Sequence, residues 1–519
     1  MNLSATQRNM KFPERLSHVA DKDAVPPTDR IAVIDIGSNS VRLVIYGKNG
    51  AYPAPLFDER SNCQLGAGLD KTGLLANERI EAALETLTRF ASIIRAMQVD
   101  SCYPVATAAV RRAKNGEEFC RPAEIILGQP IHILSQQEEA AHVARGLVLN
   151  VPEANGLVAD LGGGSIEIVA LKDGVVMHSV SLNHGHLSNV EEGEIINAIR
   201  GVGWIESFGA KQLFGVGGSF RALGSAFIER ENYPLPVLHG LKINRDSALM
   251  LCNDFLRPSS PLAGVPLARR ATMPMAAKII RALVNISAVR RVTVSGTSIR
   301  DGVVAINELS DTQRADFLVA ISKEISAASG RFAGFANELM EFLHPLKNGR
   351  EPQFARLLDV ACNLADMCWH EHSDMRGDLA ARRVLGLPVN CMTHKERTWL
   401  AMSLYHRYAG LKQNKPHPQE MQSLLGPKLQ ADAITVGLAL RFALIFSAGT
   451  CEQLKNIRLE CQPGALDQQA ELMEQVTKSL TSLAGAQTLM AEALGLKEEA
   501  AIASQNATDL EAGGLTGSD

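Results

Sequence analysis

One short pattern occurs twice in this sequence and constrains the fold more than any other feature. In each copy an aspartate ends a run of apolar residues and is followed by a polar, glycine-containing turn and a second apolar run. The first copy spans residues 31–46, with DIGSNS at 35–40, and the second spans residues 157–171, with DLGGGS at 160–165. Short apolar runs bounded by such turns predict buried strands. The repeat therefore predicts two similar α/β lobes whose turns meet at the mouth of one cleft.

Two further glycine turns follow predicted strands in the second lobe, at residues 215–219 (GVGGS) and 295–300 (SGTSIR). Glycine lets the backbone approach a ligand closely and adopt positive φ, so that successive N–H groups can point at one anion. Four such turns at strand ends predict a phosphate-binding cleft. The alternative interpretation is that the four turns are unrelated.

The order of predicted elements also suggests where the domains lie. Lobe I is expected at residues 30–150 and lobe II at 151–307, and a domain whose pattern is almost wholly helical is expected at 308–498. Residues 1–29 and 499–519 are predicted to be a flexible leader and a flexible tail. The apolar pattern of residues 472–494 favours a homodimer, because it exceeds what a lone helical domain needs.

Composition excludes several classes of protein. A net charge of -4 argues against bulk electrostatic binding of nucleic acid, so positive charge for an anionic ligand must lie in a local groove. The nine cysteines form no CxxC pair, which favours a reducing compartment over a disulfide framework or a zinc site. No uninterrupted apolar run of about 18 residues and no signal-peptide pattern occur, so a cytoplasmic protein without an integral membrane segment is expected.

Six motifs, taken in order, resemble the exopolyphosphatase/guanosine pentaphosphate phosphatase family. They are DIGSNSVRL at 35–43, ATAAVR at 106–111 with Asn115 after it, Ser135 with Glu138-Glu139-Ala140, DLGGGSIE at 160–167, GGS at 217–219 and SGTSIRDG at 295–302. The resemblance implies an actin-like (ribonuclease H-like) duplicated core and, in longer members, a helical C-terminal domain similar to HD phosphohydrolases. It also implies hydrolysis of the terminal phosphoanhydride bond of a polyphosphate.

The same resemblance implies roles for individual residues. Glu139 is similar to the general base that takes a proton from the attacking water, and Arg42 and Arg111 resemble side chains that neutralise phosphate oxygens. Asp160 and Glu167 resemble the carboxylates that hold Mg²⁺ or Mn²⁺. The implied phosphate-binding residues are Gly37, Ser38, Asn39, Ser40, Gly162, Gly163, Gly164, Ser165, Gly217, Gly218, Ser219 and Arg300.

Plainer interpretations of these residues remain open. An acidic residue in the first turn of a helix is favoured by the helix dipole alone, and Glu138 is an obvious rival to Glu139. Arg42 alternates with apolar neighbours and could face solvent. The sequence also departs from the family pattern, since Gln136 and Ala141 replace the usual glycine and arginine, and the arginine expected after Gly185 is missing.

The predicted helical domain lacks a recognisable HD metal site. Alanine stands at Ala365, where the ligand histidine would belong, so the domain is expected to be degenerate. The residues that could still hold a metal are His370, Glu371, His372, Asp374, His394 and His406.

The leading functional prediction is an exopolyphosphatase that releases orthophosphate from inorganic polyphosphate. The alternative within the same chemistry is a phosphatase that converts guanosine pentaphosphate to tetraphosphate. An actin-like ATPase or sugar kinase would share the phosphate turns but not the motifs at 138–140 and 295–302. A non-catalytic nucleotide sensor would be expected to lose Glu139 or the metal carboxylates, and all are present.

Overall fold

The computed structural model describes residues 30–47, 53–151, 154–309, 317–331, 334–348, 351–410 and 422–455. The predicted leader, the predicted tail and the apolar segment 472–494 lie outside these ranges. The chain divides into two compact units, Met1–Leu223 with Lys242–Ser310, and Gly224–Leu241 with Asp311–Asp519. Residues 224–241, which the sequence pattern places in lobe II, are thus grouped with the helical residues.

The first unit opens with a five-stranded sheet in the order β3-β2-β1-β4-β5. Strand β1 pairs antiparallel with β2 and parallel with β4, so the turn after β1 lies at the carboxyl edge of the parallel strands. The strands are β1 (Arg30–Ile36), β2 (Val41–Gly47), β3 (Ala54–Ser61), β4 (Ser101–Ala106) and β5 (His132–Ile133). The helices are α1 (Leu69–Thr72), α2 (Asn77–Ala96), α3 (Ala108–Arg112), α4 (Gly116–Leu127) and α5 (Gln136–Asn150).

The second sheet repeats this arrangement. Its order is β10-β11-β9-β6-β7-β8, so β8-β7-β6-β9-β11 correspond to β3-β2-β1-β4-β5, with β10 added at one edge. The strands are β6 (Gly156–Leu161), β7 (Ile166–Lys172), β8 (Val175–Leu182), β9 (Gln212–Val216), β10 (Lys242–Asn244) and β11 (Arg291–Val294). The helices are α6 (Glu192–Gly201), α7 (Trp204–Ser207), α8 (Gly218–Arg230), α9 (Arg245–Phe255), α10 (Leu267–Arg270), α11 (Met273–Ile286) and α12 (Ile299–Asn307). The predicted duplicated actin-like core is therefore confirmed.

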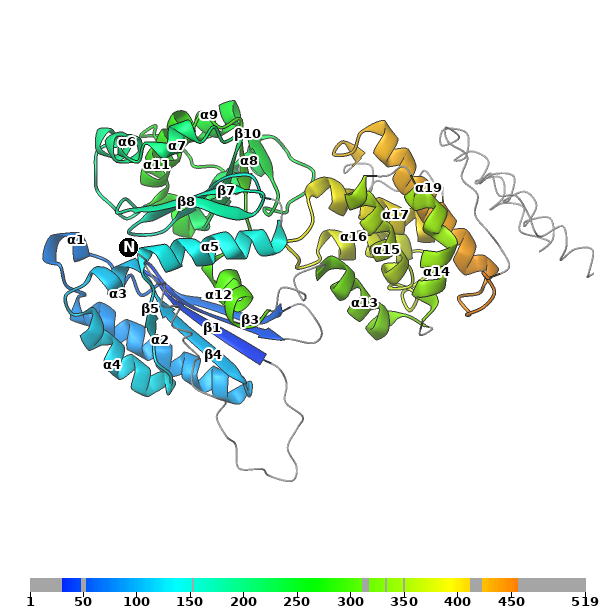
Figure 1. Cartoon of the computed structure of the whole chain (residues 1–519), viewed down its shortest axis with the longest axis horizontal. Coiled ribbons are helices and arrows are strands. Elements are labelled where there is room, and N and C mark those ends of the chain that lie inside the picture. Colours follow the sequence, from blue (N-terminus) through cyan, green and yellow to red (C-terminus); the bar gives the residue numbers. More distant parts are fainter. Residues whose placement is uncertain are drawn as a thin grey trace, which may run out of the picture. The chain divides into compact units, whose positions relative to one another are not determined.

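Helices α5 and α12 lie between the two sheets (Figure 1). Their apolar residues join one buried cluster with β1 and β2 of the first sheet and β6 and β7 of the second. Gly302 fits against α5 so closely that a Cβ there would lie 1.8 Å from the carbonyl oxygen of His142. This packing fixes the amino-terminal ends of both helices, where Glu139 and Arg300 stand, relative to both sheets.

The second unit is helical over its described residues. Its elements are α13 (Phe317–Ser329), α14 (Phe335–Leu343), the 3₁₀ helix η2 (His344–Lys347), α15 (Pro352–Leu364), α16 (Arg376–Leu385), α17 (His394–Ala409) and α19 (Pro427–Phe446). They enclose one apolar core to which Leu235 also contributes, and Trp399 is buried in it. Arg397 donates hydrogen bonds to the carbonyl oxygens of Val384, Leu385, Leu387 and Val389, and so satisfies backbone groups at and beyond the end of α16.

By length and composition alone, helix α19 could cross a membrane. However, 61% of its most apolar 18-residue stretch is buried inside the protein. A Cβ at Gly437 would lie 2.3 Å from the carbonyl oxygen of Ser403 in α17, so the two helices pack in close contact. Helix α19 is therefore a core helix of this unit.

Two of the histidines that could have held a metal in this unit, His394 and His406, make other contacts. His394 lies 2.9 Å from the Tyr233 hydroxyl and 3.0 Å from the carbonyl oxygen of His239, and Nδ1 of His406 donates to the Gly410 carbonyl oxygen. Among the residues that the structure describes, no group of three or more His, Cys, Asp or Glu side chains is placed to hold a metal.

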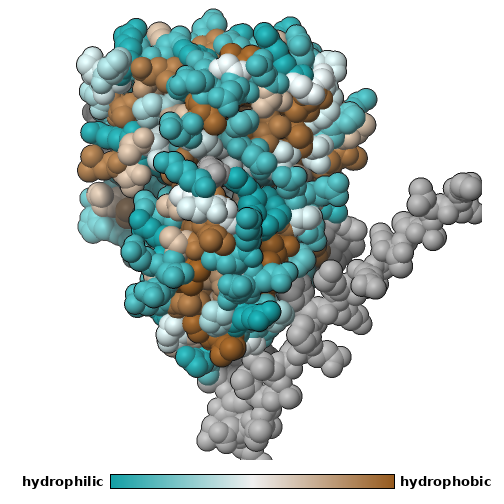
Figure 2. Space-filling view, turned by 90° about the vertical axis from the view of Figure 1, so that its left-hand side faces the viewer, coloured by the Kyte–Doolittle hydropathy of each residue, from teal (hydrophilic) through white to brown (hydrophobic). Residues whose placement is uncertain are grey.

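The face shown in Figure 2 carries mostly hydrophilic residues with hydrophobic patches scattered among them.

Candidate active site

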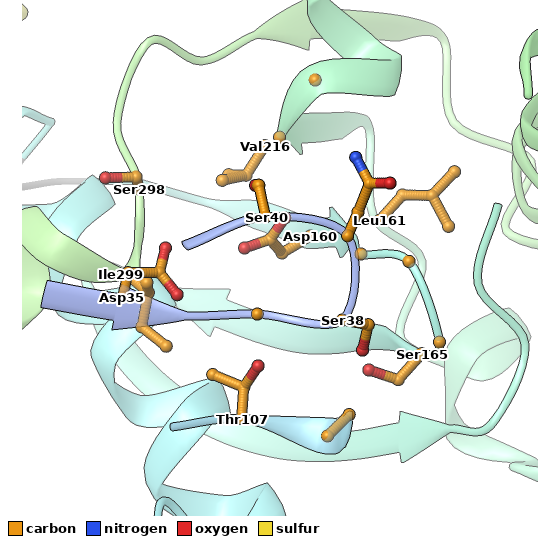
Figure 3. A pocket seen from close by; sticks show the side chains of 18 of the residues that line it. Asp35, Ser38, Ser40, Thr107, Asp160, Leu161, Ser165, Val216, Ser298 and Ile299 are labelled. Atoms are coloured by element: carbon orange, nitrogen blue, oxygen red, sulfur yellow. The ribbon is translucent and has the colours of Figure 1, made fainter. Parts of the chain in front are cut away.

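A pocket of about 150 Å³ lies in the first unit, where the turns of the two lobes meet (Figure 3). A cavity needs about 10–15 Å³ of such volume to hold one water, so the pocket has room for a phosphoryl group and waters. The predicted residues that line it are Gly37, Ser38, Asn39, Ser40, Arg42, Glu139, Asp160, Gly162, Gly163, Gly164, Ser165, Glu167, Gly217, Gly218 and Arg300. Ser219 and Arg111 do not line the pocket. Ser219 is buried, and Arg111 donates a hydrogen bond to Glu139 from outside the pocket.

The two repeated turns have the same internal geometry. In the first, the Gly37 N–H donates to the Ser40 carbonyl oxygen at 3.1 Å, and in the second the Gly162 N–H donates to Ser165 at 3.0 Å. Asp35 and Asp160 occupy matching positions, but their cross-strand partners differ. Arg42 stands opposite Asp35, and Glu167 stands opposite Asp160. The duplication thus placed a cation on one side of the pocket and a second carboxylate on the other.

Glycine is needed at this pocket because other parts of the chain approach the turns closely, both across the two lobes and within lobe II. A Cβ at Gly163 would lie 3.1 Å from the Ser38 Cβ, and one at Gly185 would lie 2.1 Å from the Gly163 carbonyl oxygen. Gly217 has φ 91°, and a Cβ there would lie 2.7 Å from Oδ1 of Asp160. Of the turn glycines that line the pocket, only Gly217 has positive φ, although the sequence pattern predicts such a backbone at all four turns.

Four carboxylates line the pocket, and the pKa values of Glu139, Asp160 and Glu167 are raised. Burial is the main cause for each. Glu139 is 7% exposed, and its pKa rises to about 7, with Arg111 opposing the rise and Asp160 and Asp35 adding to it. Burial raises the pKa of Asp160 to about 6 despite Arg221 nearby. Burial, then Glu139 and Asp160, raise the pKa of Glu167 well above its ordinary value.

The structure separates Glu139 from its neighbour Glu138. Glu138 forms a capping box with Ser135, because the Ser135 N–H donates to its carboxylate at 2.8 Å, and it also contacts His132 at 3.1 Å. Glu139 instead lines the pocket and accepts a hydrogen bond from Arg111 at 2.7 Å. Glu138 therefore caps the helix, and Glu139 is the carboxylate of the pocket.

The three predicted arginines all have acidic partners in the first unit. Arg42 pairs with Asp58 through two hydrogen bonds, Arg111 donates to Glu139 at 2.7 Å, and Arg300 donates to Asp35 at 2.7 Å. Nη2 of Arg111 and Nε of Arg300 are buried and make no hydrogen bond within the described part of the chain. Buried donors of this kind are normally satisfied by a ligand or an ordered water.

Four pocket residues with charged or titratable side chains lie outside the six motifs and were not predicted: Arg60, His186, Arg221 and Arg269. Arg221 could have been suspected, because it stands one helical turn after the Gly217-Gly218 turn. Arg60 and Arg269 come from β3 and α10, and no local motif marks them. His186 belongs to the loop where the family arginine is missing, and its N–H donates to the Gly162 carbonyl oxygen at 3.0 Å.

Comparison with known proteins gives matches along most of the chain. Residues 43–311 match the model of the Ppx/GppA phosphatase family, and residues 318–490 match the model described as exopolyphosphatase, C-terminal. A guanosine-5'-triphosphate,3'-diphosphate pyrophosphatase from Pseudoalteromonas atlantica is 27% identical over 299 residues, which are 54% of this chain and only 58% of that relative.

Two solved structures are similar to about half of this chain. The type II variant of the Aquifex aeolicus Ppx/GppA phosphatase is 25% identical, and the match covers 54% of this chain and 99% of that chain with a TM-score of 0.42. An exopolyphosphatase from Cytophaga hutchinsonii is 22% identical, with coverage of 54% and 99% and a TM-score of 0.49. Because the first family model covers more than half of the 519 residues, the chain belongs to the Ppx/GppA phosphatase family.

Proposed function

We propose that this phosphatase is an exopolyphosphatase that releases orthophosphate from the end of inorganic polyphosphate. The observation that carries the proposal is the position of Glu139, a buried carboxylate that faces the pocket where the two glycine turns meet. The match of residues 318–490 to the exopolyphosphatase C-terminal model favours polyphosphate. Guanosine pentaphosphate is the second candidate substrate, because the curated relative from Pseudoalteromonas atlantica is named for cleaving it.

The pocket supplies what phosphoryl transfer requires. Backbone N–H groups of the two turns and the guanidinium groups of Arg42 and Arg300 would bind the terminal phosphoryl oxygens and neutralise their charge. Glu139 would accept a proton from a water as the water oxygen bonds to phosphorus. The phosphoanhydride bond then breaks, and its bridging oxygen stays with the shortened chain. Arg111 holds the Glu139 carboxylate in place for this step.

The carboxylates also fit a divalent cation. Asp160 and Glu167 have carboxylate oxygens, which are the ligands that Mg²⁺ prefers. A side chain at position 217 would lie against Oδ1 of Asp160, and the glycine there leaves this oxygen uncovered. Mg²⁺ prefers one or two carboxylates together with waters and substrate phosphates, which agrees with a two-carboxylate site. Asp160 and Glu167 would hold Mg²⁺ or Mn²⁺, which supplies charge neutralisation for the transferring phosphoryl group.

Asp160→Asn is expected to raise the Mg²⁺ concentration needed for half-maximal orthophosphate release by about tenfold or more, because one of two anionic ligands is lost. The measurement is a Mg²⁺ titration of rate after chelator treatment. Asp173→Asn is the matched control, since Asp173 lies on an exposed turn and bonds Asn155. Equal Mg²⁺ dependence in the parent and Asp160→Asn would contradict the assignment.

The raised pKa of Glu139 predicts a pH dependence. The base must be deprotonated to accept a proton, so kcat/KM should rise with pH and level off above about pH 7. Arg111 opposes the rise in this pKa, so Arg111→Met should move the rising limb to higher pH as well as slow the reaction. The pH–rate profiles of both proteins give the test. A limb that stays in place or moves to lower pH in Arg111→Met would count against Glu139 as the base.

Substrate choice is tested by comparing kcat/KM for long-chain polyphosphate and for guanosine pentaphosphate with the same purified protein. A higher value for polyphosphate supports the leading proposal, and turnover of guanosine pentaphosphate alone supports the second. Release from neither substrate, with Mg²⁺ and with Mn²⁺, would overturn both.

A further inference from the structure

The arginines that line the pocket differ in whether an acidic residue neutralises them. Arg42 pairs with Asp58, and Arg300 pairs with Asp35. Arg60 and Arg269 line the same pocket, yet no carboxylate of the described residues lies within ion-pair distance of either. Two unneutralised guanidinium groups at a pocket that already holds other arginines are costly unless an anion binds between them.

Arg269 is held in a defined position. Its guanidinium lies directly over Gly218, because a Cβ at that glycine would be 2.2 Å from an Nη atom of Arg269 and 2.5 Å from its Cζ. Its other Nη lies 3.3 Å from Nε2 of His186. Burial, and then the charges of Arg269 and Arg60, lower the pKa of His186 to about 4. The ring is therefore neutral near pH 7, and Nε2 accepts a hydrogen bond from Arg269.

Arg60 lies near three other arginines, Arg42, Arg269 and Arg300. It stands directly opposite Arg42 across the β2–β3 ladder, and like charges in that position repel. Burial, followed by the charges of Arg269, Arg42 and Arg300, lowers the pKa of Arg60 to about 10, although the charge of Asp35 acts in the opposite direction. The three arginines disfavour its charge, whereas a bound phosphate group would favour it.

We propose that Arg60 and Arg269 form a second phosphate subsite, which binds the phosphoryl group next to the terminal one that reacts. This inference rests on the proposed function, because it requires that the terminal phosphoryl bind at the glycine turns. A planar guanidinium matches phosphate oxygens with two parallel hydrogen bonds, so two of them suit a doubly bridged inner phosphoryl group. The subsite would select linear phosphoanhydrides over orthophosphate, and both inorganic polyphosphate and a nucleoside 5'-triphosphate end offer this chemistry.

Equilibrium binding tests the subsite without relying on turnover. Tripolyphosphate and orthophosphate are titrated into the Glu139→Gln protein, alone and combined with Arg60→Gln or Arg269→Gln. Each arginine substitution is expected to weaken tripolyphosphate binding about tenfold or more and to change orthophosphate binding less than about threefold. Arg270→Gln is the matched control, because Arg270 is exposed, lies next to Arg269 and does not line the pocket. If Arg269→Gln does not fold, Arg269→Lys replaces it, since lysine keeps the charge but not the two-pronged geometry.

The outcomes separate this inference from the proposed function. Unchanged tripolyphosphate affinity in both arginine variants overturns the subsite, whatever the parent's activity. An equal loss of orthophosphate and tripolyphosphate binding also overturns it, because the arginines would then hold the terminal phosphoryl. Selective loss of tripolyphosphate binding, in a parent that releases no orthophosphate, keeps the subsite and removes the proposed activity. Repeating the titration with guanosine pentaphosphate shows which ligand the subsite binds. Equal losses of affinity for tripolyphosphate and guanosine pentaphosphate support a subsite that binds both, and a loss of affinity for one of them supports a subsite for that ligand.

Discussion

Glu139→Gln should lower kcat for orthophosphate release by about 10²–10⁴, because glutamine cannot accept the proton of the attacking water. Glutamine keeps the size of the side chain and can still accept a hydrogen bond from Arg111, so the pocket should keep its shape. Substrate affinity should change little, because the proposed role of Glu139 is to accept a proton and not to bind the phosphate chain. The measurement is steady-state phosphate release together with equilibrium binding of polyphosphate.

Glu138→Gln is the matched control for that experiment. The two glutamates are adjacent in sequence, but Glu138 belongs to a capping box that glutamine also satisfies. Its kcat should stay within about threefold of the parent, and its stability should fall by less than about 1 kcal/mol. A large loss of kcat in Glu138→Gln with near-normal kcat in Glu139→Gln would reverse the assignment of the two residues.

Gly302→Ala should destabilise the first unit by about 3 kcal/mol, at the upper end of the effects of overpacking. The added Cβ would lie 1.8 Å from the carbonyl oxygen of His142, so α5 and α12 would have to move apart. The obstacle is backbone, which cannot rotate away as a flexible side chain can. Because the two helices carry Glu139 and Arg300, activity should fall together with stability.

Gly193→Ala provides the opposite case on the same chain. Gly193 lies in α6, and a Cβ there would have no heavy atom within 4 Å. Alanine has less conformational freedom than glycine in the unfolded chain, so this substitution should stabilise by about 0.4–1 kcal/mol. Denaturant unfolding of both variants compares the two effects. If Gly302→Ala unfolds at the same denaturant concentration as the parent, the close α5–α12 contact does not exist in solution.

The local parts of the site could be predicted from the sequence. The strand–turn–strand geometry at residues 31–46 and 157–171 depends only on residues within each segment. Both turns have the predicted position, and both contain the same internal hydrogen bond. The pocket that brings Gly163 near Ser38 follows from the duplication, because equivalent turns of two similar lobes meet at one place. Motif order was therefore enough to place Glu139, Asp160 and Glu167 in one pocket.

The partners of the charged residues could not be predicted, since they depend on packing between distant elements. A motif identifies Arg111, but it does not show that this side chain reaches Glu139 from outside the pocket. Arg269 reaches the pocket from the short helix α10, and only the tertiary structure places it over Gly218. For the same reason the grouping of residues 224–241 with the helical unit has no local signal.

Hydrolysis of polyphosphate in ¹⁸O-labelled water shows which phosphorus atom is attacked, and so tests whether this protein hydrolyses the terminal phosphoanhydride bond. Attack on the terminal phosphoryl predicts that each released orthophosphate carries one ¹⁸O atom and that the remaining chain stays unlabelled and shortens from its end. Label on the remaining chain, internal fragments or no orthophosphate would contradict terminal hydrolysis in this pocket.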